Sequence, residues 1–355
     1  MSRPDVESAL LVVPGSLDTR TGGYIYDRRM VEGLRARGWS IGVRELDAGF
    51  PRPSAAALEH AAAVFAAIPS GTLTLVDSLA LGALPEIALT HASRLPVVAI
   101  MHLPLFADVG LDSGEAAGFL RDECRALDAV ALVIVTGRAA LPLLARCSLP
   151  SLRVVVVEPG TSEAPLARGS GGSRLRLLSV ATITPGKGHE NLLAALAAVP
   201  FRGWSLTCAG SLTRHPPTVE RVRRAVGRLG LDDRVSLVGE LDEPALEECY
   251  DRSDLFVLAT RQETYGMAVA EALARGLPVV STTTGAIPDL VGDGAGLLVA
   301  PGDTPALTEA LSRVLGDAEL RARLAEGARR QREMLPRWEE AAAKMAAALE
   351  SIGHG

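Results

Sequence analysis

Residues 261–280, RQETYGMAVAEALARGLPVV, run from a loop through a helix into an apolar strand, and they set the fold of the second half of the chain. The run Leu255–Ala259 before them is short and apolar, as strands buried in a parallel sheet are. The amides of Tyr265, Gly266 and Met267 fall at the predicted start of the helix. Free N–H groups at a helix N-terminus bind anions, most often phosphate.

Two glutamates lie on either side of this helix start. Glu263 is in the loop and Glu271 is in the helix, with residues 264–270 between them. A carboxylate does not favour a phosphate, so these side chains must serve another purpose, and hydrogen bonds to hydroxyl groups are the obvious one. A ligand with both phosphates and hydroxyls is a nucleotide sugar, and the stretch therefore predicts a nucleotide-sugar site.

The rest of the chain alternates short apolar runs with helical patterns, which predicts parallel sheets covered by helices on both faces. A length of 355 residues is too great for one ordinary core, and two domains are expected. The expected strands of the first half are Ala9–Val13, Ile41–Leu46, Leu73–Val76, Val97–Met101, Leu132–Val135 and Val154–Val157. The expected helices between them are Tyr24–Arg37, Ser54–Ala67, Leu79–Ala92, Glu115–Leu127 and Arg138–Ala145.

The Gly/Ser-rich segment 167–173, ARGSGGS, interrupts this alternation and has the composition of a flexible hinge. We expect an N-terminal domain at residues 1–168, a C-terminal domain at residues 174–335 and a separate final segment at residues 336–355. Ligands of doubly wound sheets bind at the carboxyl ends of the strands. Two such domains facing each other would place these ends on either side of one central cleft.

Composition narrows the function and the compartment. The net charge of -6 argues against non-specific binding of nucleic acid, which usually needs a basic face. The four cysteines show no CxxC pairing, and we expect neither a zinc site nor a disulfide. The polar start of the chain predicts no signal peptide, and no apolar run is long enough to cross a bilayer. A cytoplasmic protein is expected, and peripheral contact with the inner face of the membrane stays open.

Three further features stand at expected strand ends. Lys187, between Gly186 and Gly188, brings a point charge for phosphate, although such a turn also occurs with a solvated lysine. The pair at residues 22–23, Gly-Gly, offers a second phosphate approach or an ordinary helix start. His102 directly follows the strand Val97–Met101, where it serves either the site or a core hydrogen bond. No metal-binding spacing occurs, so neither a metal nor a cofactor is expected.

Taken together, these residues resemble the retaining glycosyltransferases of family 4, whose GT-B fold has two Rossmann-like domains. The resemblance runs from about Leu175 to Leu315 and is weaker in the first half. It is carried by the two glutamates and by the segments 265–267, 271–280, 238–241, 285–289 and 296–303. In the first half it is carried by Gly22, Gly23, His102, the strand end at 135–136 and the segment 158–161.

The resemblance implies a role for each site residue. Glu271 would bind the ribose hydroxyls of the donor, and Glu263 the hydroxyls of its sugar. The diphosphate would be held by Lys187, Gly22, Gly23 and the amides of Tyr265, Gly266 and Met267, with Leu241 beside the base. His102 would face the sugar near the reacting carbon, so the expected catalytic residues are His102, Glu263 and Lys187.

For the acceptor, the resemblance implies the first domain, with Tyr24 and Arg138 as contacts, and it implies that the final helix returns to that domain. One position departs from the family, which often has an arginine five residues before the lysine. Here that position is Thr182, which cannot form a bidentate phosphate clamp. The diphosphate would depend more heavily on Lys187 and on backbone amides.

The implied reaction is a retaining, metal-independent transfer of a sugar to an acceptor hydroxyl. The expected donor is a UDP- or GDP-sugar, and the acceptor is a small molecule, a glycan or a lipid-linked sugar. Two alternatives stay open: a non-hydrolysing sugar-nucleotide epimerase on the same fold, and a non-catalytic two-domain binding protein. An assay with the donor alone separates the epimerase from the transferase.

Overall fold

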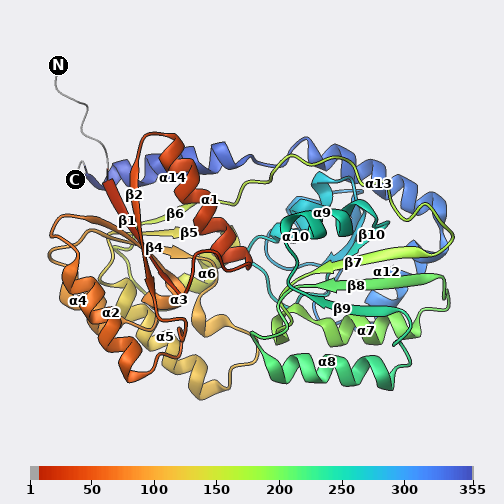
Figure 1. The fold of residues 1–355 in the computed structure, drawn as a ribbon, viewed down its shortest axis with the longest axis horizontal. Coiled ribbons are helices and arrows are strands. Elements are labelled where there is room, and N and C mark those ends of the chain that lie inside the picture. The colour runs from red at the N-terminus through yellow and green to blue at the C-terminus, as the bar shows by residue number, and fades with distance from the viewer. Residues whose placement is uncertain (1–7, 354–355) are drawn as a thin grey trace. The chain divides into compact units, whose positions relative to one another are not determined.

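The computed structural model describes residues 8–353 and divides the chain into two compact units, each with a six-stranded parallel sheet between layers of helices (Figure 1). Unit 1 is Met1–Gly160 with Pro336–Gly355, and unit 2 is Thr161–Leu335. Among the described residues, no helix combines the length and apolar character that a membrane span requires.

In unit 1 the sheet has the order β2-β1-β3-β4-β5-β6. The strands are β1 Ser8–Pro14, β2 Ser40–Leu46, β3 Leu73–Asp77, β4 Val97–Met101, β5 Leu132–Val135 and β6 Val154–Val156. Leu11 of β1 lies opposite Val43 on one side and Leu75 on the other. The chain therefore builds outward from β1 to β2 and then continues on the other side of β1 with β3. This reversal is the switch point at which doubly wound sheets bind ligands.

Helices cover both faces of this sheet. Successive side chains of a strand point to opposite faces, and in the buried strands both sets of side chains are apolar, so each face needs a covering layer. Leu11 and Val13 of β1 pack against α1 and α14, whereas Leu10 and Val12 pack against α2, α4 and α5. The helices of unit 1 are α1 Gly22–Ala36, α2 Ala55–Ala67, α3 Ser78–Leu81, α4 Pro85–His91, α5 Ser113–Leu127, α6 Leu141–Leu144 and α14 Trp338–Gly353, with 3-10 turns η1 Leu105–Ala107, η2 Arg138–Ala140 and η3 Ala145–Cys147. The final helix α14 thus belongs to unit 1.

Two helices that the sequence predicted as continuous are broken by proline. The predicted helix Leu79–Ala92 is two helices, α3 and α4, because Pro85 disfavours the helical conformation at Leu84, whose φ and ψ are -123 and 42. The predicted helix Arg138–Ala145 consists of η2 and the single turn of α6, followed by η3. Pro142 has no amide hydrogen to donate back to the preceding turn.

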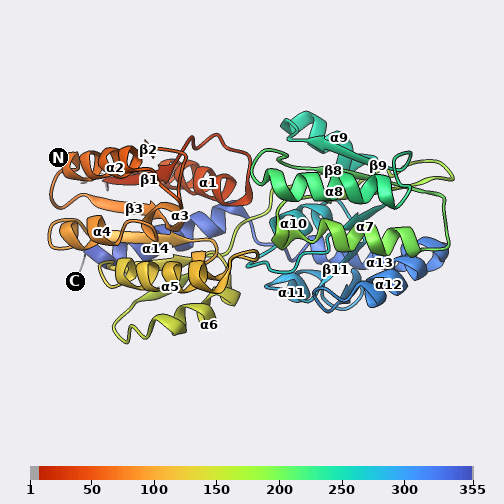
Figure 2. The same ribbon diagram turned by 90° about the horizontal axis from the view of Figure 1, so that it is seen from below.

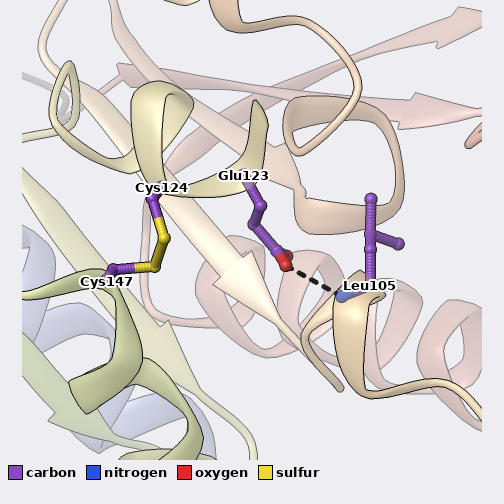
Figure 3. Close-up of a disulfide and its surroundings, with 4 residues drawn as sticks. All are labelled: Leu105, Glu123, Cys124 and Cys147. Carbon is purple, nitrogen blue, oxygen red and sulfur yellow. Dashed lines mark hydrogen bonds between the residues drawn. A yellow bond between two sulfur atoms is a disulfide. The ribbon is translucent and has the colours of Figure 1, made fainter. Parts of the chain in front are cut away.

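A disulfide joins Cys124 of α5 to Cys147 of η3, with their Cα atoms 5.1 Å apart (Figure 3). The prediction that the cysteines form no disulfide is therefore wrong for this pair, while Cys208 and Cys249 are free. The two partners are 23 positions apart and lack a CxxC spacing, so only the packing of η3 beside α5 brings them together.

Removing this disulfide is expected to destabilise unit 1 by about 3 kcal/mol, because the cross-link lowers the conformational entropy of the unfolded chain. We expect the double variant Cys124→Ser/Cys147→Ser to unfold at lower urea concentration than the wild type under oxidising conditions. In excess reductant the two proteins should unfold together. The matched control is Cys249→Ser, which removes a free, partly exposed thiol. Equal stability of the oxidised wild type and the double variant would contradict the prediction.

Unit 2 has the sheet order β12-β11-β10-β7-β8-β9, the order of a Rossmann fold. Its strands are β7 Leu175–Val180, β8 Trp204–Ala209, β9 Val235–Gly239, β10 Leu255–Val257, β11 Val279–Thr282 and β12 Gly296–Val299. Its helices are α7 His189–Ala198, α8 Pro216–Arg228, α9 Glu243–Asp251, α10 Met267–Ala274, α11 Ile287–Val291, α12 Thr304–Gly316 and α13 Ala318–Arg332, with the 3-10 turn η4 Pro185–Lys187. Figure 2 shows α7 and α8 side by side, and both pack on the same core.

The predicted linker at residues 167–173 lies inside unit 2, since the division between the units falls earlier, at Thr161. Its backbone is tied to α9 and the start of β10. The amide of Gly169 donates to the carbonyl of Asp251 at 2.9 Å, and the amide of Ser170 donates to the carboxylate of Asp254 at 3.0 Å. Arg168 adds an ion pair with Asp251. Composition alone predicted a hinge here, and in the structure these long-range hydrogen bonds join the segment to the end of α9 and to Asp254, just before β10.

Candidate functional site

The switch point of unit 2 lies between β7 and β10, which are neighbours in the sheet although 75 residues or so separate them in the chain. The turn η4 follows β7 and carries Lys187, and the loop after β10 carries Glu263. Two hydrogen bonds tie these segments together. The amide of Arg261 donates to the carbonyl of Gly186 at 2.7 Å, and the hydroxyl of Thr260 donates to the same carbonyl at 3.1 Å.

Lys187 and Glu263 form an ion pair, with 2.6 Å between Nζ and Oε2. Both side chains are only partly exposed, 28% for Lys187 and 16% for Glu263. The other oxygen of Glu263 accepts a hydrogen bond from the amide of Thr264 at 3.2 Å. The two residues that the sequence predicted separately are therefore one unit, in which the carboxylate balances the cation. An anionic ligand at Lys187 must compete with this carboxylate.

The backbone around Glu263 depends on two glycines with positive φ. Gly266, at φ 103, is the N-cap of α10 and turns the chain into the helix. Gly285, at φ 56, packs so closely that a Cβ atom there would lie 2.3 Å from the carbonyl oxygen of Glu263. The loop after β11 thus packs directly against the backbone of the Glu263 loop, which limits the positions that the carboxylate can take.

Glu271 lies on α10 and is held by a buried tyrosine. The hydroxyl of Tyr250, from α9, donates to Oε2 of Glu271 at 2.9 Å. The guanidinium of Arg275 lies 4.4 Å from the centre of the Tyr250 ring and donates to the carbonyl of Glu271 at 3.1 Å. Burial, followed by the charge of Glu271, raises the pKa of Tyr250 well above its usual value, so the phenol stays protonated and remains a donor.

The remaining donor residues that were predicted in unit 2 lie at the same edge of its sheet. Met267 is the first residue of α10, and Tyr265 precedes its cap. The side chain of Tyr265 packs in the core, so this residue offers the site its backbone. Leu241 is half-buried between β9 and α9, and Thr182 is half-buried in the loop between β7 and η4.

In unit 1 a second group of polar residues surrounds His102, just beyond the end of β4. Its Nε2 atom lies 3.2 Å from Oδ1 of Asp27 and 3.6 Å from Oδ2 of Asp77. Asp27 comes from α1, and Asp77 ends β3 and caps α3 through the amide of Leu79. The ring also rests on Gly23, where a Cβ atom would lie 3.0 Å from the Cδ2 atom of His102. The residues predicted at β1 and β4 thus meet at the switch point of this sheet.

Both aspartates are buried, with exposed fractions of 0% for Asp27 and 2% for Asp77. Burial, followed by the charge of Asp27, raises the pKa of Asp77 to about 7. Burial alone would lower the pKa of His102, but the charge and hydrogen bond of Asp27 and the charge of Asp77 outweigh it and raise this pKa. One atom from each of the three side chains lies within 4.8 Å of the others, a spacing that metal sites share with ion pairs.

The two residues predicted to contact an acceptor differ in their surroundings. Tyr24 is buried, and its hydroxyl donates to the carbonyl of Pro14 within unit 1. Tyrosine at the start of an amphipathic helix gave no indication of which way its ring would turn. Arg138 is 75% exposed, with Glu158 at 3.9 Å, and its side chain is available to a ligand.

Three residues of these groups were missed from the sequence: Asp27, Asp77 and Tyr250. Asp77 directly follows an apolar run, and the reasoning that selected His102 at a strand end selects Asp77 as well. Asp27 and Tyr250 carry no such signal. Both lie within helices, and only the packing of α1 and α9 shows that they face a site residue.

Comparison with known proteins relates the second half of this chain to a family. Residues 167–331 match the family described as Glycosyl transferases group 1. The chain is 27% identical over 332 residues to "MMP alpha-(1->4)-mannosyltransferase" of Mycolicibacterium hassiacum, covering 88% of this chain and 79% of that protein. It is 31% identical over 153 residues to "Alpha-D-kanosaminyltransferase" of Streptomyces kanamyceticus, covering 43% of this chain and 39% of that protein.

Solved structures share the whole architecture. Sucrose-phosphate synthase from Thermosynechococcus elongatus has a TM-score of 0.81 at 22% identity, covering 98% of this chain and 99% of that one. Anabaena HepE in complex with UDP-glucose has a TM-score of 0.76 at 17% identity, covering 97% of this chain and 99% of that one. The prediction of a GT-B fold with two Rossmann-like domains is confirmed. These relatives favour neither an epimerase nor a binding protein.

Proposed function

We propose that this chain, which carries a glycosyl transferases group 1 domain at residues 167–331, transfers a sugar from a nucleoside diphosphate sugar to an acceptor hydroxyl, retaining the configuration of the sugar carbon. The observation that carries this proposal is the pairing of Lys187 with Glu263 at the switch point of unit 2. A cation for phosphate and a carboxylate for hydroxyls stand within 2.6 Å of each other, and the donor needs both groups.

In this proposal the donor replaces the internal ion pair. The diphosphate takes Lys187 and the amides at the start of α10, and Glu263 is released to bind sugar hydroxyls. Glu271, positioned by Tyr250, binds the ribose. As the bond from the sugar carbon to the phosphate breaks, negative charge grows on the leaving phosphate, and Lys187 stabilises it there. The acceptor oxygen bonds to the same carbon, and the leaving phosphate takes up the proton of the acceptor hydroxyl. This arrangement requires no metal ion.

For the donor we propose a UDP- or GDP-hexose. Support comes from the names of the relatives: HepE was solved with UDP-glucose, and the relative from Mycolicibacterium hassiacum is named a mannosyltransferase. For the acceptor we propose a hydroxyl of a small molecule, a glycan or a lipid-linked sugar, with Arg138 as an exposed contact.

The experiment that tests the function has two stages. A thermal-shift screen with UDP, GDP, ADP and dTDP selects the nucleotide, since a ligand that binds only the folded protein raises its melting temperature. The matching sugar nucleotides are then incubated with candidate acceptors, with and without EDTA, and the anomeric configuration of the product is read by proton NMR. Inversion would refute the retaining mechanism, and loss of transfer in EDTA would refute metal independence.

Replacing Tyr250 with phenylalanine is expected to weaken binding of the nucleotide by about two- to tenfold, the effect of losing one net hydrogen bond. The fold should remain, because the ring keeps its stacking on Phe256 and Arg275. Isothermal titration with the nucleotide selected above measures the dissociation constant.

A second measurement distinguishes positioning of the ribose carboxylate from a general loss of structure. The Tyr250→Phe variant should bind a 2′-deoxyribose nucleotide almost as well as the wild type does, because a ribose hydroxyl is the group that Glu271 holds. Equal weakening for the ribose and the deoxyribose nucleotide would show that Tyr250 does not act through Glu271.

A further inference from the structure

In the His102 group, two buried carboxylates face one imidazole nitrogen, and the proposed donor site gives these carboxylates no role. Charged groups are rarely buried unless they are paired, and removing both aspartates from water is unfavourable unless a positive charge compensates them. Apart from His102, no described residue forms an ion pair with Asp27 or Asp77. The imidazole is the cation available to them.

We propose that Asp27 and Asp77 are positioning residues that hold His102 as an imidazolium with Nε2 turned inward, so that its outer N–H acts as a charged hydrogen-bond donor to the substrate. The part that His102 plays in transfer rests on the proposed function. The pairing of the three side chains does not, because it is a property of unit 1 alone.

The contacts of the ring indicate that Nδ1 is the nitrogen atom accessible to a ligand. Nε2 faces the two carboxylates, and Gly23 packs against the part of the ring formed by Cδ2, Cγ and Nε2. The histidine side chain is nevertheless 22% exposed, and the edge left for this exposure is the one with Nδ1 and Cε1. Nε2 lies 3.2 Å from Oδ1 of Asp27, and the proton on Nδ1 completes the imidazolium.

The protonation states of the group are consistent with this assignment. Asp77, with a pKa raised to about 7, takes up a proton near neutral pH, which reduces the negative charge buried opposite the imidazolium. The low-dielectric interior favours this loss of a buried charge. Of the residues that the structure describes, Tyr26 is the other titratable group against the ring, edge to face at 5.4 Å. Burial raises the pKa of Tyr26 well above its usual value, so it contributes no charge.

The sign of the pH effect follows from the raised pKa of His102. Imidazolium is fully formed below the ordinary value near 6.5 and is lost as the pH rises through the raised value. Transfer should therefore fall on the alkaline side of that raised pKa. His102 acting as a general base would show the opposite behaviour, with activity lost on the acid side.

The test is an NMR titration of the histidine ring protons in the protein without donor, with the His102 signal assigned by its absence in His102→Gln. In the wild type, His102 should titrate above 6.5. In Asp27→Asn, which keeps the shape of the side chain, the midpoint should fall by at least one pH unit, and Asp77→Asn should also lower it. The matched control is Glu123→Gln, another buried carboxylate of unit 1, which accepts the amide of Leu105 at 2.9 Å (Figure 3).

Three results would overturn the proposal: a wild-type midpoint at or below 6.5, a midpoint unchanged in Asp27→Asn, or a His102 signal that shifts on addition of EDTA. Asp27→Asn should also move the alkaline limb of kcat down by the same interval. If the NMR midpoints shift but this limb does not, the imidazolium takes no part in transfer and that part is refuted. If the midpoints shift while the wild type transfers no sugar, the pairing stands and the proposed function fails.

Discussion

Replacing Lys187 with alanine is expected to lower kcat by about 10²- to 10³-fold, the range seen when one preorganised group that stabilises developing charge is removed. Lys187 is the cation that lies at the switch point between β7 and β10, next to Glu263. Without it, the growing charge on the leaving phosphate has only amides to stabilise it, and Glu263 becomes an unpaired carboxylate beside that phosphate. Both changes act in the same direction.

The chain contains only two lysines, Lys187 and Lys344, so a substitution of Lys344 controls for the loss of a lysine away from the site. Lys344 is exposed on α14, so Lys344→Ala should leave kcat and KM unchanged. Lys187→Arg keeps the charge but not the compact ammonium group, and it should recover part of the lost rate. The measurement is steady-state transfer at saturating donor. An unchanged kcat in Lys187→Ala would show that the ion pair with Glu263 has only a structural role. The proposed function would then lose its main support.

The same pair of lysines allows a measurement that needs no acceptor. An amine-reactive reagent should modify Lys344 at the same rate with and without the nucleotide. Modification of Lys187 should slow in its presence, because the diphosphate covers the ammonium group. Peptide mass spectrometry separates the two sites. Unchanged labelling of Lys187 at saturating nucleotide would place the diphosphate elsewhere.

Replacing Gly188 with alanine is expected to destabilise unit 2 by about 2–5 kcal/mol. The φ angle of 66 adds about 1–2 kcal/mol of backbone strain for a residue with a Cβ atom. A Cβ atom would also lie 1.9 Å from the carbonyl oxygen of Ala259, a clash with backbone that cannot move like a side chain, and overpacking of this kind costs about 1–3 kcal/mol more.

Gly230 provides the matched control for this prediction. Its φ is 63, almost the same as that of Gly188, but no atom lies within 4 Å of a Cβ built there. Gly230→Ala should therefore show the strain without the clash and lose about 1–2 kcal/mol. Trp204 is the one tryptophan of unit 2, so urea unfolding followed by its fluorescence in a Trp39→Phe/Trp338→Phe background reports this unit. Equal losses in the two glycine variants would contradict a close approach of η4 to the end of β10.

Local patterns in the sequence were enough to identify the elements and the ends of strands where the site lies. The alternation of apolar runs and helices predicted two doubly wound domains, and it failed mainly where prolines divide helices, as at Pro85. Lys187, Glu263 and His102 were found because each follows a buried strand, where a parallel sheet collects its ligand-binding residues. Each of these predictions uses residues that are close together in the sequence, so it needs no knowledge of the tertiary structure.

Strand order and helix packing decided the rest, because they bring together residues that no local pattern connects. Lys187 meets Glu263 only because β7 and β10 are neighbours in the sheet. Cys124 reaches Cys147 only because η3 packs beside α5. Asp27 and Asp77 surround His102 because β3 and β4 are adjacent and α1 covers the same end of the sheet. The sequence by itself determined which strand ends carry the candidate side chains, and the tertiary structure determined their partners, since pairing energies depend on distance in space and not on distance along the chain.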